Sequence, residues 1–145
     1  MREEKIEKFQ SAKIFQVWDA LVSHAHFLLR SSYTDPDSGN IDIIFIGTSY
    51  LEIPTMLYGL EIAETLDSFL LDQFTKRTGK KFGIGTGNKL FEIKSAGKEF
   101  YVIAGQVLID TNTLETFESP LRAILGIDDK EREGYLLKLK SSFYI

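Results

Sequence analysis

The two histidines of this chain lie two residues apart, at His24 and His26. An imidazole acts as a general base when a carboxylate orients it, or as a pH sensor. On a helix, residues two apart point about 200° away from each other, whereas a helical zinc pair is spaced three or four apart. The spacing therefore predicts no metal site here and leaves His24 and His26 as single acid–base candidates.

A glycine-rich stretch, Gly83-Ile84-Gly85-Thr86-Gly87, comes shortly before Lys89. Backbone amides of such a loop can approach a phosphate closely. A Walker motif, however, needs a Gly-Lys pair followed by Ser or Thr, and here Asn88 separates Gly87 from Lys89. The dinucleotide fingerprint needs a strand before the glycines and a helix after them, which is the reverse of the order predicted here. We interpret the stretch as a connection and expect no nucleotide cofactor.

Alternating oxygen ligands occur twice, at Asp35 and Asp37 and at Asp110 and Asn112. Calcium loops begin in this way, but neither segment continues with the glycine and glutamate that an EF-hand requires, so both are interpreted as turns. The chain has no Cys, which excludes disulfides, thiolate zinc sites and iron–sulfur clusters. It also has no Gly-x-Ser-x-Gly motif. We therefore predict no metal, no cofactor and no catalytic nucleophile.

The composition predicts one globular domain over residues 1–145. The chain has 17 basic and 21 acidic residues, a net charge of −4, and 43% hydrophobic residues. An acidic balance disfavours non-specific binding to nucleic acid or to an anionic membrane. No apolar run approaches the 18–20 residues of a membrane span, and the N-terminus lacks the apolar core of a secretory signal. These features predict a cytoplasmic protein that binds neither nucleic acid nor membrane.

The elements that must position any site begin with residues 3–31. Apolar residues recur there at steps of three and four, which predicts a long amphipathic helix; they are Ile14, Val17, Trp18, Leu21, Ala25 and Leu28. Phe9 and Phe27 would lie together off the main apolar stripe. Two interpretations remain for them: helix ends covered by loops, or a second interface.

The rest of the chain predicts strands and shorter helices. A strand is expected at 41–46, a helix at 65–78, and a hairpin formed by 90–94 and 99–103. Gly105 is interpreted either as a second hairpin turn, giving a meander, or as a bulge in one long strand. The predicted fold class is α+β: a long N-terminal helix packed on a mostly antiparallel sheet, with one further mid-chain helix.

Aromatic residues make up 12% of the chain. Tyr33, Tyr50 and Tyr58, with Phe9 and Phe27, are the candidates for a protein-contact surface, since aromatic residues dominate interface hot spots. The leading hypothesis is a small acidic interaction module, of the inhibitor or immunity type, that binds a basic partner surface. One alternative is an enzyme or small-molecule-binding protein in which His24 or His26 works with a carboxylate. Another is a homodimeric structural protein that associates through Phe9 and Phe27.

Overall fold

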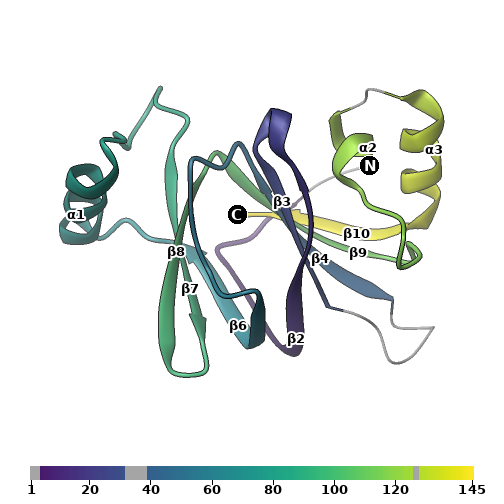
Figure 1. The fold of residues 1–145 in the computed structure, drawn as a ribbon, viewed down its shortest axis with the longest axis horizontal. Helices are drawn as coiled ribbons and strands as arrows, with labels where there is room; N and C mark the ends of the chain where they lie inside the picture. Colours follow the sequence, from purple (N-terminus) through teal and green to yellow (C-terminus); the bar gives the residue numbers. More distant parts are fainter. Residues whose placement is uncertain (1–3, 32–38, 126–127) are drawn as a thin grey trace.

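The computed structural model describes residues 4–31, 39–125 and 128–145, and most of them belong to one mixed sheet (Figure 1). The strands are β1 (Glu4–Lys5), β2 (Lys8–Leu21), β3 (His26–Ser31), β4 (Asn40–Ile46), β5 (Tyr50–Glu52), β6 (Met56–Glu64), β7 (Lys89–Ser95), β8 (Lys98–Ala104), β9 (Gln106–Asn112) and β10 (Leu139–Tyr144). The helices are α1 (Ser68–Thr78), α2 (Leu121–Leu125) and α3 (Asp129–Lys138), with a short 3-10 helix η1 (Val22–His24).

The prediction of a long N-terminal helix over residues 3–31 is wrong. The described part of this segment forms β2 and β3, which pair with each other as an antiparallel hairpin. η1 lies between them, and Ala25 (φ 53°) reverses the chain in the left-handed region. The predicted arrangement of a helix packed across a sheet is therefore replaced by a sheet whose strands include the N-terminal segment.

Two irregularities in β2 explain the misleading pattern. The pairing of β2 with β6 shifts between Ser11 and Ile14, and its pairing with β3 shifts between Val17 and Asp19. Each such bulge inserts an extra residue and interrupts the alternation of faces. In addition, both faces of β2 are covered in part, because Phe15 is fully buried in the main core while Trp18 packs on the opposite face. Apolar residues on both faces, offset by bulges, imitate helical spacing.

The sheet closes on itself through two bent chain segments. β4 continues through Gly47 into β5, and β8 continues through Gly105 into β9. β4 pairs with β9, and β5 pairs with β8. The segment β4–β5 therefore lies beside the segment β8–β9 on both sides of the bend. The remaining neighbours follow in the order β4, β3, β2, β6, β7 and β8, which returns to the starting segment. Gly105 is thus the bend in one long strand, and the predicted meander at this position is not formed.

The main core fills the inside of the closed sheet. Its buried side chains come from β2, β3, β4, β6, β7, β8 and β9, together with Ile145; they are Phe15, Leu29, Ile43, Phe45, Leu57, Leu60, Ile62, Phe91, Ile93, Val102, Ala104, Val107, Ile109 and Ile145. Burial of each large apolar side chain contributes about 1.5–3 kcal/mol. This core supports the elements that lie outside the ring.

The helices cover two separate parts of the outer face. α1 packs through Phe74 on Leu90 and Ile103 at one end of the molecule. α2 packs through Leu121 on outward-facing residues of β3, β4 and β9 at the other end. Figure 1 shows α1 at the left end of the long axis, with α2 and α3 at the right end.

Three predicted elements are confirmed, and the first is the strand expected at 41–46, which is β4. The mid-chain helix expected at 65–78 is α1, which ends at Gly79 as expected. It begins three residues later than expected, after Asp67, whose carboxylate accepts the backbone N–H groups of Phe69 and Leu70. The predicted hairpin is formed by β7 and β8. A glycine at a helix end and a short turn act locally, so they are visible in the sequence.

Two glycines in the left-handed region provide a test of this packing. A Cβ on Gly39 (φ +72°) would lie 2.4 Å from the carbonyl oxygen of Asn112, whereas one on Gly97 (φ +75°) would meet nothing within 4 Å. Both alanine variants carry about 1–2 kcal/mol of backbone strain, and Gly39→Ala adds about 1–3 kcal/mol because the backbone must shift. Urea unfolding measures both. Equal losses of stability would show that β9 does not approach Gly39 this closely.

Candidate functional site

Polar side chains line the outer face of β4 and β9, which is the face that points away from the main core. Asn40 pairs in register with Asn112, and Asp42 with Asp110. All four are at most 3% exposed. The side-chain amide of Asn112 links its two neighbours: its Oδ1 accepts a hydrogen bond from Asn40 Nδ2 at 3.0 Å, and its Nδ2 donates to Asp42 Oδ2 at 2.8 Å. Buried polar groups need partners of this kind, so the row is a fixed hydrogen-bonded network.

Arg30 on β3 is the cation of this network, and its side chain is 1% exposed. Its Nε and Nη2 donate to the two carboxylate oxygens of Asp42 at 2.7 and 2.8 Å. Its Nη1 donates to the backbone carbonyls of Glu118 at 2.9 Å and Glu115 at 3.3 Å. The ring of Trp18 lies 5.5 Å from the guanidinium carbon, within range of a cation–π contact. Arg30 thereby ties the loop 113–120 to the sheet.

Asp110 binds α3 and β10, which lie beside the loop 113–120 on this face of the sheet. It accepts hydrogen bonds from the hydroxyl of Tyr135 on α3 and from that of Ser142 on β10. Pro120 and Ser119 start α2, with Ser119 Oγ accepting the backbone N–H of Leu121. The buried network therefore fixes the loop, α3 and β10 on one face of the sheet.

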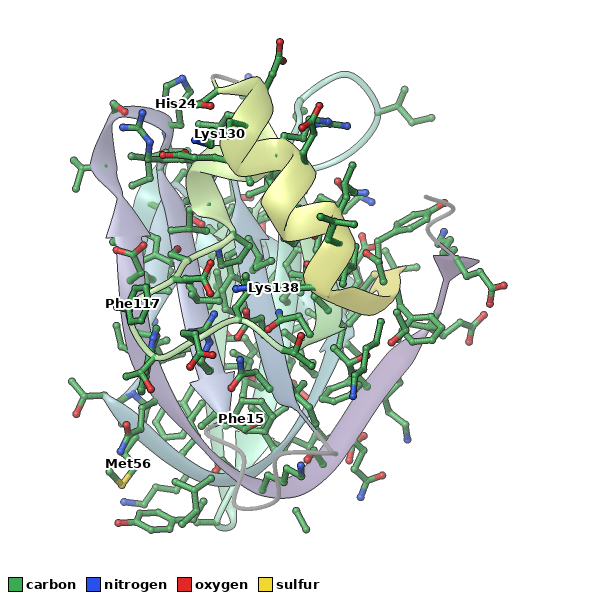
Figure 2. The ribbon with its side chains drawn as sticks, turned by 90° about the vertical axis from the view of Figure 1, so that its right-hand side faces the viewer. Phe15, His24, Met56, Phe117, Lys130 and Lys138 are labelled. Atoms are coloured by element: carbon green, nitrogen blue, oxygen red, sulfur yellow. The ribbon has the colours of Figure 1, made fainter. Side chains whose placement is uncertain are left out.

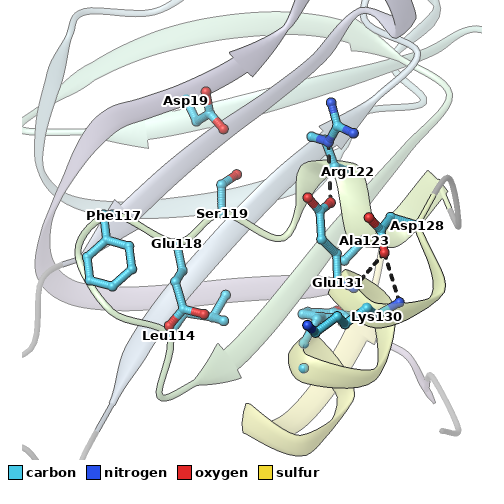
Figure 3. Close-up of a pocket in the computed structure, with 12 residues that line it drawn as sticks. Asp19, Leu114, Phe117, Glu118, Ser119, Arg122, Ala123, Asp128, Lys130 and Glu131 are labelled. Carbon is cyan, nitrogen blue, oxygen red and sulfur yellow. Dashed lines mark hydrogen bonds and ion pairs between the residues drawn. The ribbon is translucent and has the colours of Figure 1, made fainter.

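A pocket of about 530 Å³ lies between this loop, α2 and the start of α3 (Figure 3). Its lining has four carboxylates against two cationic side chains. The lining residues are Asp19, Leu114, Phe117, Glu118, Ser119, Arg122, Ala123, Asp128, Lys130, Glu131, Gly134 and Tyr135. We call this hollow the acid-lined pocket.

The charged groups of the acid-lined pocket are partly committed to local contacts. Glu131 pairs with Arg122 at 3.3 Å, and the Asp128 carboxylate accepts the backbone N–H groups of Lys130 and Glu131 at the start of α3. The ammonium of Lys138 and the backbone N–H of Glu115 lower the pKa of the Glu118 carboxyl. Glu118 also forms an ion pair with Lys138, so Asp19 and Asp128 are the lining carboxylates without an ion pair among the described residues.

Phe117 gives the pocket an apolar edge. Its side chain is 87% exposed on the loop 113–120. Figure 2, which looks onto this end of the molecule, shows α3 in front of the strands and Phe117 on the loop beside them. A concave surface with excess carboxylates and an exposed aromatic ring suits a cationic group on an aliphatic stem, such as a Lys or Arg side chain.

The two histidines lie closer together than helical geometry predicts. Because Ala25 turns the chain between them, the ring centroids of His24 and His26 are 6.1 Å apart. Burial, and secondarily the charge of His24, lower the pKa of His26, whose residue is 4% exposed. His24 is exposed, and its Nδ1 lies 2.9 Å from the hydroxyl of Ser23. Within residues 4–31, 39–125 and 128–145, the hydrogen-bond partners of the imidazoles are the Ser23 hydroxyl for His24 and the backbone N–H of Gly47 for His26.

The predicted contact residues occupy separate places. Phe9 and Phe27 are partly buried against the main core. Tyr50 packs edge-on against Phe74 beneath α1, and its hydroxyl bonds to Glu52. Tyr58 is 64% exposed on β6, and Tyr33 lies outside the described residues. The four described residues therefore do not form one continuous patch.

Sequence reasoning missed the acid-lined pocket and the network beneath it. Asp110 and Asn112, interpreted as a turn, lie within β9. One available signal was Asp42, a charge inside an otherwise apolar strand, because a buried charge requires a partner. Asp19, Phe117 and Glu131 carry no comparable signal, since they meet only after the loop and α3 have folded over the sheet.

Comparisons with protein-family models, curated proteins and solved structures find no match for this chain. Within the described residues, no helix has the length and apolar character to cross a membrane.

The buried pair provides a stability test. Asp42→Ala leaves the Arg30 guanidinium buried without its carboxylate, and we expect a loss of about 3–5 kcal/mol in the free energy of unfolding. The double variant Arg30→Met/Asp42→Leu should lose less than the sum of the two single variants. As a control, Glu61→Gln breaks an exposed pair with Lys8 and should change stability by about 0.5 kcal/mol or less. Additive losses in the double variant would contradict this assignment.

His26 predicts the sign of a pH effect. Because its folded-state pKa is lowered, the unfolded chain binds more protons as the pH falls below the ordinary histidine value of about 6.5. Stability is therefore full above that value and decreases on acidification, by at most about 1.4 kcal/mol per pH unit for this one group. Unfolding of His26→Gln between pH 7 and about pH 5.5 should show a smaller slope. The exposed His24→Gln is the matched control, and identical slopes in wild type and His26→Gln would refute the effect.

Proposed function

We propose that this chain is a small protein-interaction module that binds a basic surface of a partner protein at the acid-lined pocket. The observation that carries the proposal is the pocket itself: four carboxylates face two cationic side chains beside an 87% exposed phenylalanine. A basic side chain entering there would meet the carboxylates of Asp19 and Asp128, which form no ion pair among the described residues, and an apolar wall.

The charge of the whole molecule supports this assignment. A net charge of −4 attracts a basic partner over distances of about 8–10 Å at physiological salt. Such steering raises association rates and discriminates against acidic partners.

Rigidity of the pocket also supports it. The loop that carries Phe117 is fixed by hydrogen bonds from the Arg30 guanidinium to the backbone carbonyls of Glu115 and Glu118. A further hydrogen bond runs from Trp18 Nε1 to the carbonyl of Thr116. A surface that is already ordered loses less conformational entropy when it binds. An exposed aromatic ring on a fixed loop has the character of an interface anchor.

Peptide selection tests the proposal directly. A display library of random peptides is selected on the wild-type chain and counter-selected on Asp19→Asn/Glu131→Gln, which removes two pocket carboxylates. We expect enriched peptides to carry Lys or Arg, to bind the variant about tenfold more weakly, and to lose affinity as salt is raised.

The matched control is Asp72→Asn/Glu99→Gln, which makes the same change in net charge away from the pocket. It should bind the selected peptides within about twofold of wild type. Enriched peptides without basic residues, or equal binding to the two double variants, would overturn the proposal.

A further inference from the structure

A second surface lies at the α1 end of the molecule, and it is apolar and basic where the acid-lined pocket is acidic. A groove of about 400 Å³ runs between α1 and the 79–88 connection. Its lining is mostly apolar, from Leu66, Leu71, Phe82, Ile84 and Leu90, and its charged residues are Glu64 and Lys89. We call this groove and the loop beside it the α1 groove.

Large apolar side chains are left uncovered around the α1 groove. Ile84 is fully exposed, Leu66 is 78% exposed and Phe69 is 69% exposed. Ile84 lies on the glycine-rich loop, where Gly83 and Gly85 have positive φ and nothing lies within 4 Å of their Cβ positions. The loop therefore presents an apolar side chain away from the body of the protein, which is typical of a binding surface.

The chain segment that forms the α1 groove carries a net positive charge. Residues 64–89 contain five basic and three acidic side chains, whereas the whole chain has a net charge of −4. Lys80, Lys81 and Lys89 form no ion pair with any residue in the described part of the chain. The α1 groove thus combines free cationic groups with exposed apolar ones.

The acid-lined pocket offers the complementary combination. Phe117 projects from its edge, and Glu115 and Glu118 flank this ring in the sequence. The two surfaces lie at opposite ends of the long axis in Figure 1, so one molecule cannot bring its own pair together.

We propose that the basic partner of the acid-lined pocket is a second copy of this chain, which docks its α1 groove there. The inference rests on the proposed function. Phe117 of one copy packs in the apolar groove beside Ile84 of the next, while Lys80 and Lys81 face the carboxylates of the pocket. Because the two surfaces differ, the contact is head-to-tail, and each added copy leaves one pocket and one groove free for further growth.

Sedimentation velocity provides the first test. The contact is small, so we expect a dissociation constant of about 10 μM to 1 mM. The weight-average sedimentation coefficient of the wild-type chain should rise with concentration past the value of a dimer, and less steeply at high salt.

Two double variants change exposed or half-exposed residues of the two surfaces: Ile84→Ser/Lys81→Glu in the α1 groove and Phe117→Ser/Asp19→Asn in the acid-lined pocket. Each should weaken association about tenfold or more. Leu137→Ser, an 86% exposed residue of α3 outside the pocket lining, is the matched control and should associate like wild type.

Mixing the two double variants is the decisive experiment. The Ile84→Ser/Lys81→Glu chain keeps an intact pocket, and the Phe117→Ser/Asp19→Asn chain keeps an intact α1 groove. Each alone should remain monomeric, whereas an equimolar mixture should form 1:1 dimers and nothing larger, because growth is blocked at both remaining ends. A mixture that stays monomeric at concentrations where wild type associates would overturn the head-to-tail contact.

The remaining outcomes separate this inference from the function on which it rests. A wild-type chain that stays monomeric at about 1 mM while basic peptides still bind the pocket overturns self-association and leaves the proposed function standing. Binding of a monomeric chain to phosphatidylserine vesicles through Lys80 and Lys81 would likewise overturn the second copy as occupant. Loss of both peptide binding and association would overturn both proposals.

Discussion

The bidentate pair between Arg30 and Asp42 is the constraint on which the outer half of this molecule depends. Both groups are removed from water, so every donor of the guanidinium needs an acceptor. Asp42 satisfies two donors, and the carbonyls of the 115–118 segment take the third nitrogen. The loop is therefore held by the need to satisfy a buried charge, and the acid-lined pocket exists because that loop has a fixed position.

Local features of this fold can be predicted from sequence, and features that need distant partners cannot. Gly79 marks the end of α1, and the Ala96–Gly97 turn marks the β7–β8 hairpin, because these signals involve only neighbouring residues. The helix predicted over 3–31 failed because bulges in β2 and apolar contacts on both of its faces produce steps of three and four residues. Those contacts come from β3, β6 and the elements on the outer face, and the spacing of apolar residues along one segment holds no information on such distant partners.

The candidate site divides in the same way. Asp42 is recognisable as anomalous within an apolar strand, but its partner Arg30 lies on a different strand and carries no signal of its own. The carboxylates of the acid-lined pocket come from β2, the 113–120 loop and α3, so their proximity is a property of the tertiary structure. Conversely, the histidine pair was judged by helical angles, and the turn at Ala25 brings the two rings together instead.

The closure of the sheet has a consequence for the way the chain reaches this structure. β4 completes its hydrogen bonds on one side only when β9 arrives, and the paired residues Asn40 and Asn112 are 72 positions apart. Contacts between such distant residues make folding slow, on the millisecond-to-second scale typical of all-β domains. During synthesis, the apolar β4 edge remains open until most of the chain has left the ribosome, and at that stage the nascent chain is most exposed to strand-to-strand misassembly.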